Sequence, residues 1–333
     1  MLNQKFSNSS SEYGRFMDRT DTPPKVSLWE MLSVIKEILF DAKSRTPQGK
    51  LPEVRSEMLP FLVPGETLKF IWFGHSTLLL NMDGQTILID PVFSKFASPI
   101  NFINKRFQPA VITLEELPPI DDIVISHNHY DHLDKKTIKF FRNKATKFIV
   151  PLGVGKHLRD WGISSSRISE LNWGESLTSN ALTYTAAPAR HFSGRGLFDS
   201  NKTLWASWVI QGKLEKIFYS GDSSYSNHFK EIGNRFGPFD LAFIENGQYD
   251  KRWIDAHMLP EETIQAVIDL KARTFVPVHW GMFDMAVHNW SEPVKCIYKL
   301  AKTHELPIIT PRFGEVVEII SRQTYFPWWE SLI

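Results

Sequence analysis

The sequence is poor in cysteine, since Cys296 is the only one among 333 residues. A single cysteine cannot form a disulfide framework within the chain, and it cannot supply the thiolate cluster of a structural metal site. Any metal site must therefore be built from histidine and carboxylate side chains. The scarcity of cysteine also fits a reducing compartment, so we expect a cytoplasmic protein.

The chain also lacks an excess of charge of either sign. Lys and Arg together number 38 and Asp and Glu 37, which leaves a formal net charge of +1. This balance does not favour nucleic acid or an anionic membrane as a partner, and we expect no nucleic-acid partner. The densest basic run is interpreted as a solvated helix face in preference to a rim that recruits anions. Its members are Lys135, Lys136, Lys139, Arg142, Lys144 and Lys147.

Long hydrophobic runs are absent as well. No stretch of about eighteen apolar residues occurs, and residues 1–24 lack the basic and then apolar pattern of a signal peptide. These absences predict a soluble protein. The hydrophobic content of 42% and the aromatic content of 13% suffice for a substantial core, in one large domain or two average ones.

The first 66 residues differ in composition from the rest. Residues 1–26 are polar and rich in serine, which favours an extended or mobile arm. Ser27 and Glu30 have the spacing of a capping box and begin an amphipathic helix over residues 28–40, with apolar residues at Leu28, Met31, Leu32, Ile35, Ile38 and Leu39. We expect this helix to dock on the main domain or else to contact a membrane surface or a partner. Residues 41–66 contain several prolines and predict a linker, so the expected division is 1–66 and 67–333.

From residue 68 onward, strand signals come first and an alternation of strands and helices follows. Strands are predicted at 68–73, 76–81 and 85–90, the last two joined by a tight turn at Asp83-Gly84, and then at 122–126, 147–151, 182–187, 204–210, 215–220, 239–245, 274–279 and 315–320. Helices are predicted at 135–142, 153–160, 226–233, 260–271 and 292–303. This pattern favours an α/β fold with sheets covered by helices on their outer faces.

The segment between Ile125 and Asp134 is the strongest functional signal in the sequence. Four potential metal ligands fall within six residues, directly after an apolar strand: His127, His129, Asp131 and His132. A divalent metal site needs nitrogen and oxygen donors that converge from a fixed backbone, and this spacing at a strand end supplies them. The alternative, a polar loop whose histidines only form hydrogen bonds, is much less favoured.

Three further candidates follow predicted strands in the same way. They are His191, Asp222 and His279, and each comes where an apolar strand gives way to a small or turn residue. Strand ends at one edge of a sheet can direct several loops to one point. Asp90 and Asp134 either hold the N–H groups of ligand histidines or cap turns. His157, His228, His288 and His304 have no such pattern around them and are expected on the surface.

The ordered set of histidines and aspartates resembles the metallo-β-lactamase superfamily over residues 68–320. The resemblance implies a four-layered αβ/βα sandwich, here with an N-terminal helical arm. It also implies one metal ion on His127, His129 and His191, a second on Asp131, His132 and His279, and Asp222 as a bridge between them.

Further stretches are similar to the N-acylphosphatidylethanolamine-hydrolysing phospholipase D family. They are Phe73-Gly-His75-Ser-Thr, Leu88-Ile-Asp90-Pro-Val-Phe-Ser94, Leu117-Pro-Pro-Ile-Asp121, Leu204-Trp-Ala-Ser-Trp208 and Arg235-Phe-Gly-Pro-Phe-Asp240. Residues 244–249 and 257–260 depart from that family near the mouth of the site. The resemblance therefore supports the same metal chemistry more strongly than it supports the same substrate.

The chemistry that the resemblance implies, and with which the residue types agree, is hydrolysis by a binuclear metal centre. Two divalent ions lower the pKa of a shared water from ~15.7 towards ~7, which gives a bridging hydroxide that attacks the substrate. Zinc is the favoured metal, and iron or manganese would fit the same ligands. The catalytic candidates are Asp131, Asp222 and His257, the last as a proton donor or phosphate ligand or else as a helix-entry residue. His75, Tyr249, Trp253 and Phe283 are the candidates for lining a substrate pocket.

The expected substrate is a phosphodiester, with a phospholipid of the N-acylphosphatidylethanolamine type as the leading class. A lactonase or another ester or phosphodiester hydrolase of the same fold is the alternative, and a non-catalytic metal-binding regulatory protein is less favoured. A phospholipid substrate would imply peripheral contact with a membrane. The aromatic tail, residues 325–329, either packs back on the domain or forms a homodimer contact.

Overall fold

The computed structural model describes residues 9, 11–12, 14–17, 28–40, 45–63, 67–100, 103–196, 198–319 and 325–332. Within these residues, two large mixed sheets face each other. The first has seven strands in the order β15-β3-β4-β5-β6-β7-β8. Its members are β3 (Lys69–Trp72), β4 (Leu78–Met82), β5 (Gln85–Ile89), β6 (Asp122–Val124), β7 (Lys147–Pro151), β8 (Ile168–Leu171) and β15 (Val316–Glu318).

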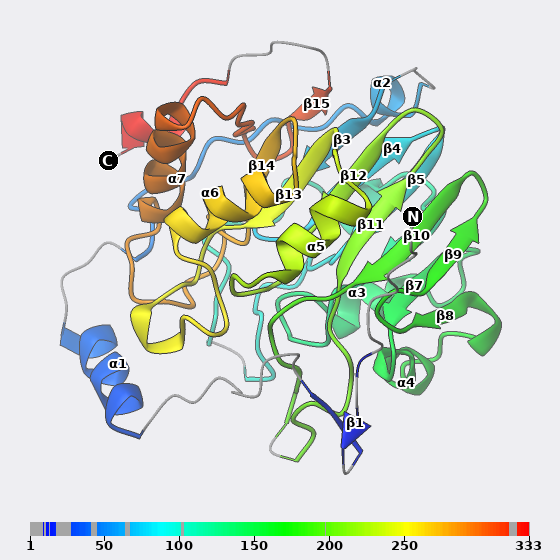
Figure 1. The fold of residues 1–333 in the computed structure, drawn as a ribbon, viewed down its shortest axis with the longest axis horizontal. Coiled ribbons are helices and arrows are strands. Elements are labelled where there is room, and N and C mark those ends of the chain that lie inside the picture. The colour runs from blue at the N-terminus through cyan, green and yellow to red at the C-terminus, as the bar shows by residue number, and fades with distance from the viewer. Residues whose placement is uncertain are drawn as a thin grey trace.

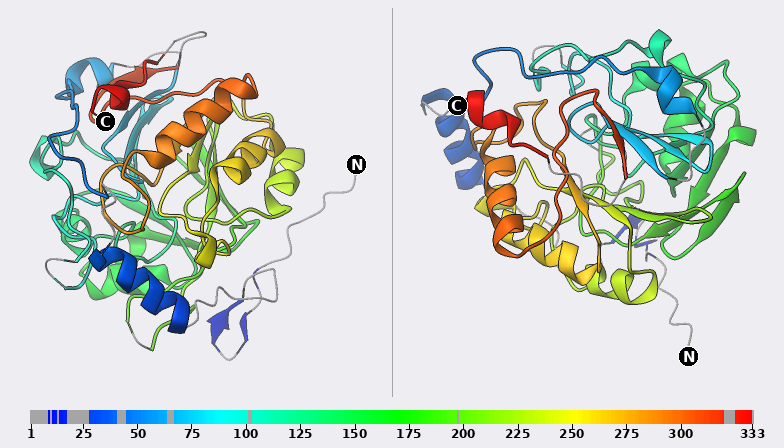
Figure 2. Two further views of the ribbon diagram at one scale, coloured as in Figure 1. Left: turned by 90° about the vertical axis from the view of Figure 1, so that its left-hand side faces the viewer. Right: turned by 90° about the horizontal axis from the view of Figure 1, so that it is seen from above.

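The second sheet has six strands in the order β14-β13-β12-β11-β10-β9. They are β9 (Ser176–Ser179), β10 (Leu182–Ala187), β11 (Ser207–Gln211), β12 (Lys216–Tyr219), β13 (Leu241–Glu245) and β14 (Phe275–Val278). Helices cover the outer face of each sheet, as the view from above in Figure 2 shows. α3 (Lys135–Phe140) and α4 (Val154–Asp160) lie on the seven-stranded sheet. α5 (His228–Arg235), α6 (Pro260–Asp269) and α7 (Glu292–Thr303) lie on the six-stranded sheet.

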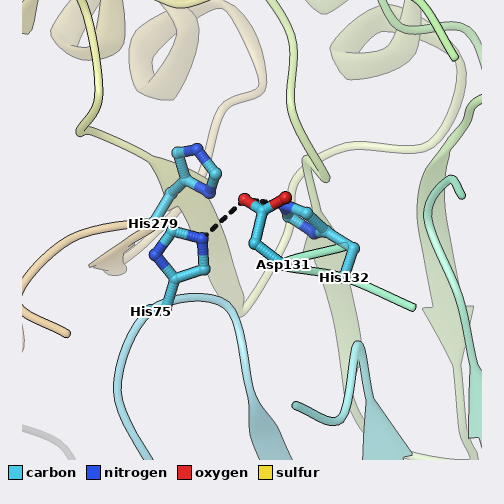
Figure 3. A group of neighbouring side chains, drawn as sticks. All are labelled: His75, Asp131, His132 and His279. Atoms are coloured by element: carbon cyan, nitrogen blue, oxygen red, sulfur yellow. Dashed lines mark hydrogen bonds and ion pairs between the residues drawn. The ribbon is translucent and has the colours of Figure 1, made fainter. Parts of the chain in front are cut away.

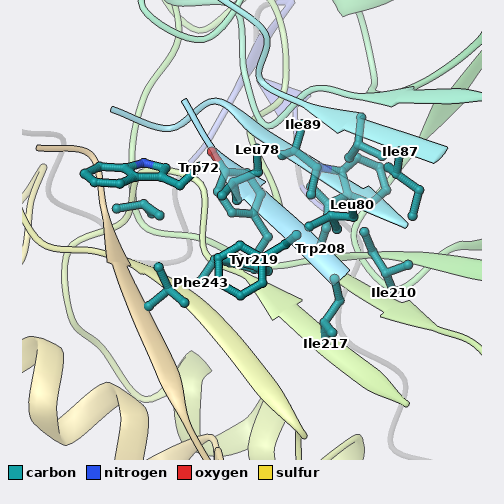
Figure 4. Packing of buried hydrophobic residues seen from close by; sticks show 14 of the residues in the cluster. Trp72, Leu78, Leu80, Ile87, Ile89, Trp208, Ile210, Ile217, Tyr219 and Phe243 are labelled. Carbon is teal, nitrogen blue, oxygen red and sulfur yellow. The ribbon is translucent and has the colours of Figure 1, made fainter. Parts of the chain in front are cut away.

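The alternation of side chains along each strand explains why both faces of both sheets are covered. In β4, Leu78 and Leu80 point into the core between the sheets, whereas Leu79 joins the cluster under the outer helices. In β12, Ile217 and Tyr219 likewise face the other sheet, and Phe218 packs against α5 and α6. Figure 4 shows the central core between the sheets. The structure thus confirms the predicted four-layered sandwich.

The hairpin between β4 and β5 has the predicted two-residue turn. Asp83 and Gly84 both have positive φ, 50° and 73°, and Met82 pairs with Gln85 directly across the turn. Two positive φ angles suit the right-handed twist of the flanking strands, which is why an Asp-Gly pair is favoured there. The other predicted strands and helices are present with shifts of a few residues at their ends. Sequence patterns missed β8 and β9, which are short and only partly buried.

The N-terminal segments are only partly described. The amphipathic helix is present as α1 (Leu28–Phe40). The segment interpreted as a linker contains a short helix, α2 (Met58–Leu62), and places Leu51 and Phe61 in the hydrophobic core. Most of residues 1–26 lie outside the described residues. Those described include a pair of two-residue strands, β1 (Ser11–Glu12) and β2 (Arg15–Phe16).

The aromatic tail packs back on the domain. Trp329 is 1% exposed, and its ring lies against those of Trp280 and Tyr298, while Trp328 stacks on Trp280. The structure therefore confirms that the tail packs on the domain, and the homodimer stays a prediction. In the described part of the chain, no helix combines the length and the apolar character that crossing a membrane would require.

Candidate metal centre

The candidate ligands gather at one edge of the sandwich, where strands of both sheets end. β3, β5 and β6 run parallel to one another, as do β10, β12, β13 and β14, so that their carboxyl ends share an edge. The residues that lie at or just beyond these ends are His75, Asp90, the segment 127–134, His191, Asp222, Glu245 and His279. Seven separate chain segments thus converge on one place.

The backbone at these strand ends bends sharply. His75, Asp90 and His279 have φ values of 51°, 39° and 67°, in the left-handed region that non-glycine residues seldom adopt. Gly221, directly before Asp222, has φ 57°, and a Cβ there would lie 2.7 Å from Cβ of Ser126. Only glycine therefore lets the loop after β12 approach the loop after β6. Strain of this kind is characteristic of functional sites.

The first group of donors comprises His127, His129, His191 and Asp222. Nδ1 of His129 lies 2.9 Å from Nε2 of His127 and 3.3 Å from Nε2 of His191. Oδ2 of Asp222 lies 3.6 Å from Nε2 of His127 and 3.7 Å from Nε2 of His191. These are the residues that the sequence resemblance assigned to one ion and the bridge, and the structure brings them together.

The second group comprises His75, Asp131, His132 and His279 (Figure 3). Nε2 of His132 lies 3.3 Å from Oδ2 of Asp131 and 3.1 Å from Oδ2 of Asp222. Nδ1 of His279 lies 3.2 Å from Oδ1 of Asp222. The predicted second set is therefore adjacent to the first, and Asp222 contacts both.

His75 was expected to line a substrate pocket, but it lies inside the second group. Its side chain is 1% exposed, and Nε2 is 2.8 Å from Oδ2 of Asp131. Its ring centroid lies 4.2 Å from that of His279. His75 thus fixes the Asp131 carboxylate or could itself offer a ring nitrogen to an ion.

Burial decides the protonation of most of the cluster. It lowers the pKa of His127 and His191 well below the usual value and that of His129 to about 4, so these imidazoles are neutral at pH 7 and offer free lone pairs. Burial also raises the pKa of Asp222 to about 6, because the charged form loses its hydration.

His132 is the exception among the histidines. Burial alone would lower its pKa, but the carboxylates of Asp222, Asp131 and Asp90 raise it well above the usual value. These buried carboxylates therefore keep His132 protonated, whereas burial keeps the neighbouring ligand histidines neutral. A divalent cation would supply the positive charge that this arrangement otherwise takes from a proton.

Unpartnered polar atoms support the fit to metal ions. Nε2 of His132 and Oδ1 of Asp222 are buried and make no hydrogen bond of suitable geometry, although atoms of Asp131, Asp222 and His279 lie 3.3, 3.1 and 3.2 Å away. Buried polar atoms normally have partners, and orphaned donors or acceptors at a site often mark an absent ion or water. Imidazole nitrogens and carboxylate oxygens are the ligand types that zinc, iron and manganese accept. The residues present therefore fit divalent metal ions.

Asp90 holds a histidine N–H, one of the two roles considered for it. Its carboxylate is fully buried and accepts hydrogen bonds from Nδ1 of His132 at 2.7 Å, from the backbone N–H of Ser126 at 2.7 Å and from the hydroxyl groups of Ser126 and Tyr219. Asp134 has the other role. It caps α3 by accepting from the N–H of Lys136 and also binds Ser94.

Glu245 was not recognised as a site residue from the sequence. It is fully buried at the end of β13, and Oε2 lies 3.1 Å from Nδ1 of His257, while Oε1 accepts from the N–H of Met258 at 2.8 Å. The ring of His257 stacks on that of His279, with centroids 5.0 Å apart. The signal was present, because Glu245 ends an apolar strand just as Asp222 and His279 follow one.

Of the other residues predicted to line the substrate pocket, one lies beside the candidate ligands and two pack elsewhere. Phe283 packs edge-on against His75 at 5.2 Å, which puts it beside the second group. Tyr249 is 7% exposed and packs on His288, and Trp253 donates from Nε1 to the carbonyl of Gln248. In the described part of the chain, no hydrogen bond, ion pair or ring contact joins Tyr249 or Trp253 to the candidate ligands.

Some histidines expected on the surface are not exposed. His228 is 4% exposed at the start of α5, and its Nε2 lies 3.1 Å from Oγ of Ser223. His157 is half-buried beside Asn128, and His288 is half-buried beside Tyr249. The prediction was wrong because a polar residue with no periodic pattern can still be buried when a loop folds over it.

Comparison with known proteins agrees with this geometry. Residues 85–280 match a family described as the beta-lactamase superfamily domain. An uncharacterized protein of Mycobacterium tuberculosis is 43% identical over 307 residues, which covers 90% of this chain and 81% of that protein. The N-acyl-phosphatidylethanolamine-hydrolyzing phospholipase D 1 of Caenorhabditis elegans is 36% identical over 269 residues, which covers 75% of this chain and 76% of that protein.

Solved structures show the same fold. A metallo hydrolase from the archaeon Ignicoccus hospitalis superposes with a TM-score of 0.59 at 22% identity, over 77% of this chain and 100% of that chain. The domain match, the relatives at 43% and 36% identity and the shared fold point the same way. The chain belongs to the metallo-β-lactamase superfamily of metal-dependent hydrolases and resembles the N-acylphosphatidylethanolamine-hydrolysing phospholipase D family within it.

Proposed function

We propose that this protein is a binuclear metal-dependent phosphodiesterase that acts on a phospholipid such as N-acylphosphatidylethanolamine. The observation that carries the binuclear part is the position of Asp222. Its Oδ2 faces His127 and His191 of the first group and His132 of the second, while its Oδ1 faces His279. A carboxylate with donors on both sides is suited to bridging two cations.

The chemistry of such a pair, when bound, is Lewis-acid polarisation of the substrate and activation of water at neutral pH. The groups that would hold it are His127, His129 and His191 on one side, Asp131, His132 and His279 on the other, and Asp222 between them. We propose zinc as the metal, with iron or manganese as alternatives that the same donors accept.

His257 is the proposed proton donor. Glu245 fixes its ring through Nδ1, so that Nε2 remains for proton exchange with the leaving oxygen of the substrate. Its side chain is 13% exposed, whereas those of His127 and His191 are 1% exposed. His257 therefore lies between the buried donors and the solvent, where a leaving group departs. Asp131 is oriented by its contact with Nε2 of His75.

The metal content tests the binuclear part. Full-length protein reconstituted with excess zinc and desalted is expected to retain close to two metal equivalents per chain, measured by atomic emission against protein concentration. His257→Gln, which alters no proposed ligand, should retain the same number. One equivalent or fewer in folded protein would contradict the shared-carboxylate arrangement.

The proposed substrate class is tested by comparing turnover of a phospholipid, a nucleotide phosphodiester and a lactone. The relative in Caenorhabditis elegans is named for hydrolysis of N-acyl-phosphatidylethanolamine, and this supports a phospholipid as the substrate. Metal-loaded protein should release a phosphatidic acid from N-acylphosphatidylethanolamine faster than it hydrolyses a nucleotide phosphodiester or a lactone. Preferential turnover of the lactone would instead assign a lactonase.

A phospholipid substrate needs a surface that meets the lipid, and α1 is the proposed one. Trp29 and Leu32 on α1 are 80% and 46% exposed. Arg252 holds the helix in place, since Nη1 and Nη2 each lie 3.0 Å from one carboxylate oxygen of Glu37. The exposed apolar side chains thus belong to a helix that is joined by this ion pair to the segment that leads to His257.

Replacing both exposed residues, Trp29→Glu with Leu32→Glu, is expected to reduce vesicle binding about 10-fold or more. Each apolar side chain that enters the interface contributes ~1 to 2 kcal/mol. Hydrolysis of lipid in vesicles should fall, while turnover of a soluble short-chain phosphodiester should not change.

The matched control is Leu59→Glu with Val63→Glu at α2, where the side chains are 82% and 58% exposed. α2 lies at the opposite end of the molecule in Figure 1. Equal loss of vesicle binding in both double variants would show that α1 has no special role.

A further inference from the structure

A cavity of about 910 Å³ lies beside the loop that carries the candidate metal ligands. Its walls come from residues 94–99, from Tyr130 in the loop, from the first turns of α3, from His157 and Trp161, and from Arg195. None of the candidate metal ligands lines it. The cavity is therefore a separate hollow, and Tyr130, which lies between His129 and Asp131 in the chain, is one of its walls.

The charge of the cavity is strongly one-sided. Four lysines and one arginine line it: Lys95, Lys135, Lys136, Lys139 and Arg195. In the described part of the chain, none of the four ammonium groups has an ion-pair or hydrogen-bond partner. The acidic lining residue is Asp134, whose carboxylate already accepts hydrogen bonds from Ser94, Lys136 N–H and Thr137. A cleft lined by one sign of charge concentrates ligands of the opposite sign.

Lys135, Lys136 and Lys139 are exposed, as predicted for a solvated helix face, and aromatic side chains stand beside them in the cavity. Phe96, Tyr130 and Trp161 add aromatic surface between the cations. The guanidinium of Arg195 lies 3.8 Å from the ring centre of Tyr130 and 5.3 Å from that of Trp161, which places it between the two rings. Cations and aromatic rings arranged around a hollow match a ligand with a charged group and an uncharged part.

Arg195 also connects the cavity to the metal loop. Its Nη1 donates to the carbonyl oxygens of Asn128 at 2.7 Å and Leu133 at 2.8 Å, and these residues bracket His129, Asp131 and His132. The arginine is thus held by the loop, while the exposed lysines line other parts of the hollow. The cavity is a fixed structure, because its wall is built into the segment that positions the candidate ligands.

We infer that this cavity binds a phosphate-bearing ligand with more than one negative charge. Lysine binds phosphate as a point charge, and a phosphomonoester carries about −1.5 to −2 at pH 7, which suits several unpaired ammonium groups around one anion. The volume fits a small molecule or a lipid headgroup, within the usual ~300 to 1,000 Å³ range of ligand pockets. The inference does not rest on the proposed phosphodiesterase activity.

The test uses metal-loaded, full-length protein and glycerol 3-phosphate, titrated by calorimetry. Lys135→Gln with Lys139→Gln is expected to weaken binding about 10-fold or more, because two charge-assisted contacts are lost. The matched control, Lys144→Gln with Lys213→Gln, removes the same charge from exposed lysines outside the cavity and should leave binding unchanged. Equal weakening in both double variants would show a nonspecific effect of net charge and overturn the inference.

The variant Asp222→Asn distinguishes binding of glycerol 3-phosphate in the cavity from binding at the metal centre. Glycerol 3-phosphate bound in the cavity should still bind this variant, and its binding should remain sensitive to the lysine substitutions. Binding that disappears in Asp222→Asn and ignores the lysine substitutions would assign the anion to the metal centre and overturn the inference.

The source of the phosphate is distinguished with vesicles. Phosphatidylcholine vesicles with and without phosphatidic acid are sedimented with each double variant. If phosphatidic acid increases vesicle binding and the substitutions at Lys135 and Lys139 remove that increase, the ligand is a lipid headgroup. If these substitutions weaken only the binding of glycerol 3-phosphate, the ligand is a soluble phosphate compound. If Lys135→Gln with Lys139→Gln weakened neither the binding of glycerol 3-phosphate nor the binding of phosphatidic acid vesicles, the proposed phosphate site would be wrong.

Discussion

Asp222→Asn is expected to lower turnover at least ~100-fold while the protein remains folded. The amide keeps the size of the side chain but removes the negative charge that faces both groups of donors, so that two cations can no longer share it. We expect one of the two metal equivalents to be lost on desalting. Turnover on a soluble phosphodiester and metal content by atomic emission are the two measurements.

Thermal stability gives a readout that is independent of activity. Burial raises the pKa of Asp222 to about 6, but the same carboxylate also faces the charged His132, so the readout is the zinc-dependent rise in Tm of each protein and not the Tm of the metal-free forms. Added zinc should raise the Tm of the original protein by mass action and raise that of Asp222→Asn much less. Asp160→Asn, an exposed change on α4, serves as the control. Unchanged turnover and an unchanged zinc-dependent rise in Tm would show that Asp222 is not a ligand.

Asp90→Asn is expected to weaken zinc binding about 10- to 100-fold, the usual effect of losing a carboxylate that orients a ligand histidine. The buried carboxylate accepts from Nδ1 of His132, from Ser126 and from Tyr219. An amide would turn one acceptor oxygen into an N–H₂ group that faces these donors. His132 would then lose the partner that directs Nε2 toward Asp131 and Asp222. Competition with a zinc chelator measures the change.

Asp134→Asn is the matched control for this substitution. Asp134 lies two residues after His132, but its carboxylate caps α3 and binds Ser94 and no candidate ligand. Losing part of this cap should cost about 1 kcal/mol of stability without a change in zinc affinity. If both variants weakened zinc equally, proximity to the loop would explain the effect better than the hydrogen bond to His132.

Local sequence patterns were sufficient for most strands and helices and for most of the candidate donors, while the four-layered arrangement was implied by the family resemblance. Alternating apolar residues, the Asp-Gly turn and the helix-start signals are local features, and each reports the burial and backbone conformation of its own segment. The set His127, His129, Asp131 and His132 is likewise local. The strands that were missed, β8 and β9, lie at the outer ends of their sheets, where weak burial leaves weak periodicity.

By itself, the sequence determined which donor types the site can offer, because these residues and their positions after predicted strands follow from the order of residues. Only the tertiary structure decided which distant side chains meet. The contacts of His75 with Asp131 and of Glu245 with His257 depend on strand order and loop path, as does the cavity that the lysines of α3 line together with Arg195. Strand order and loop path are set by the packing of the two sheets against each other. The residues next to a strand end in the sequence do not show which other strand end will lie opposite it.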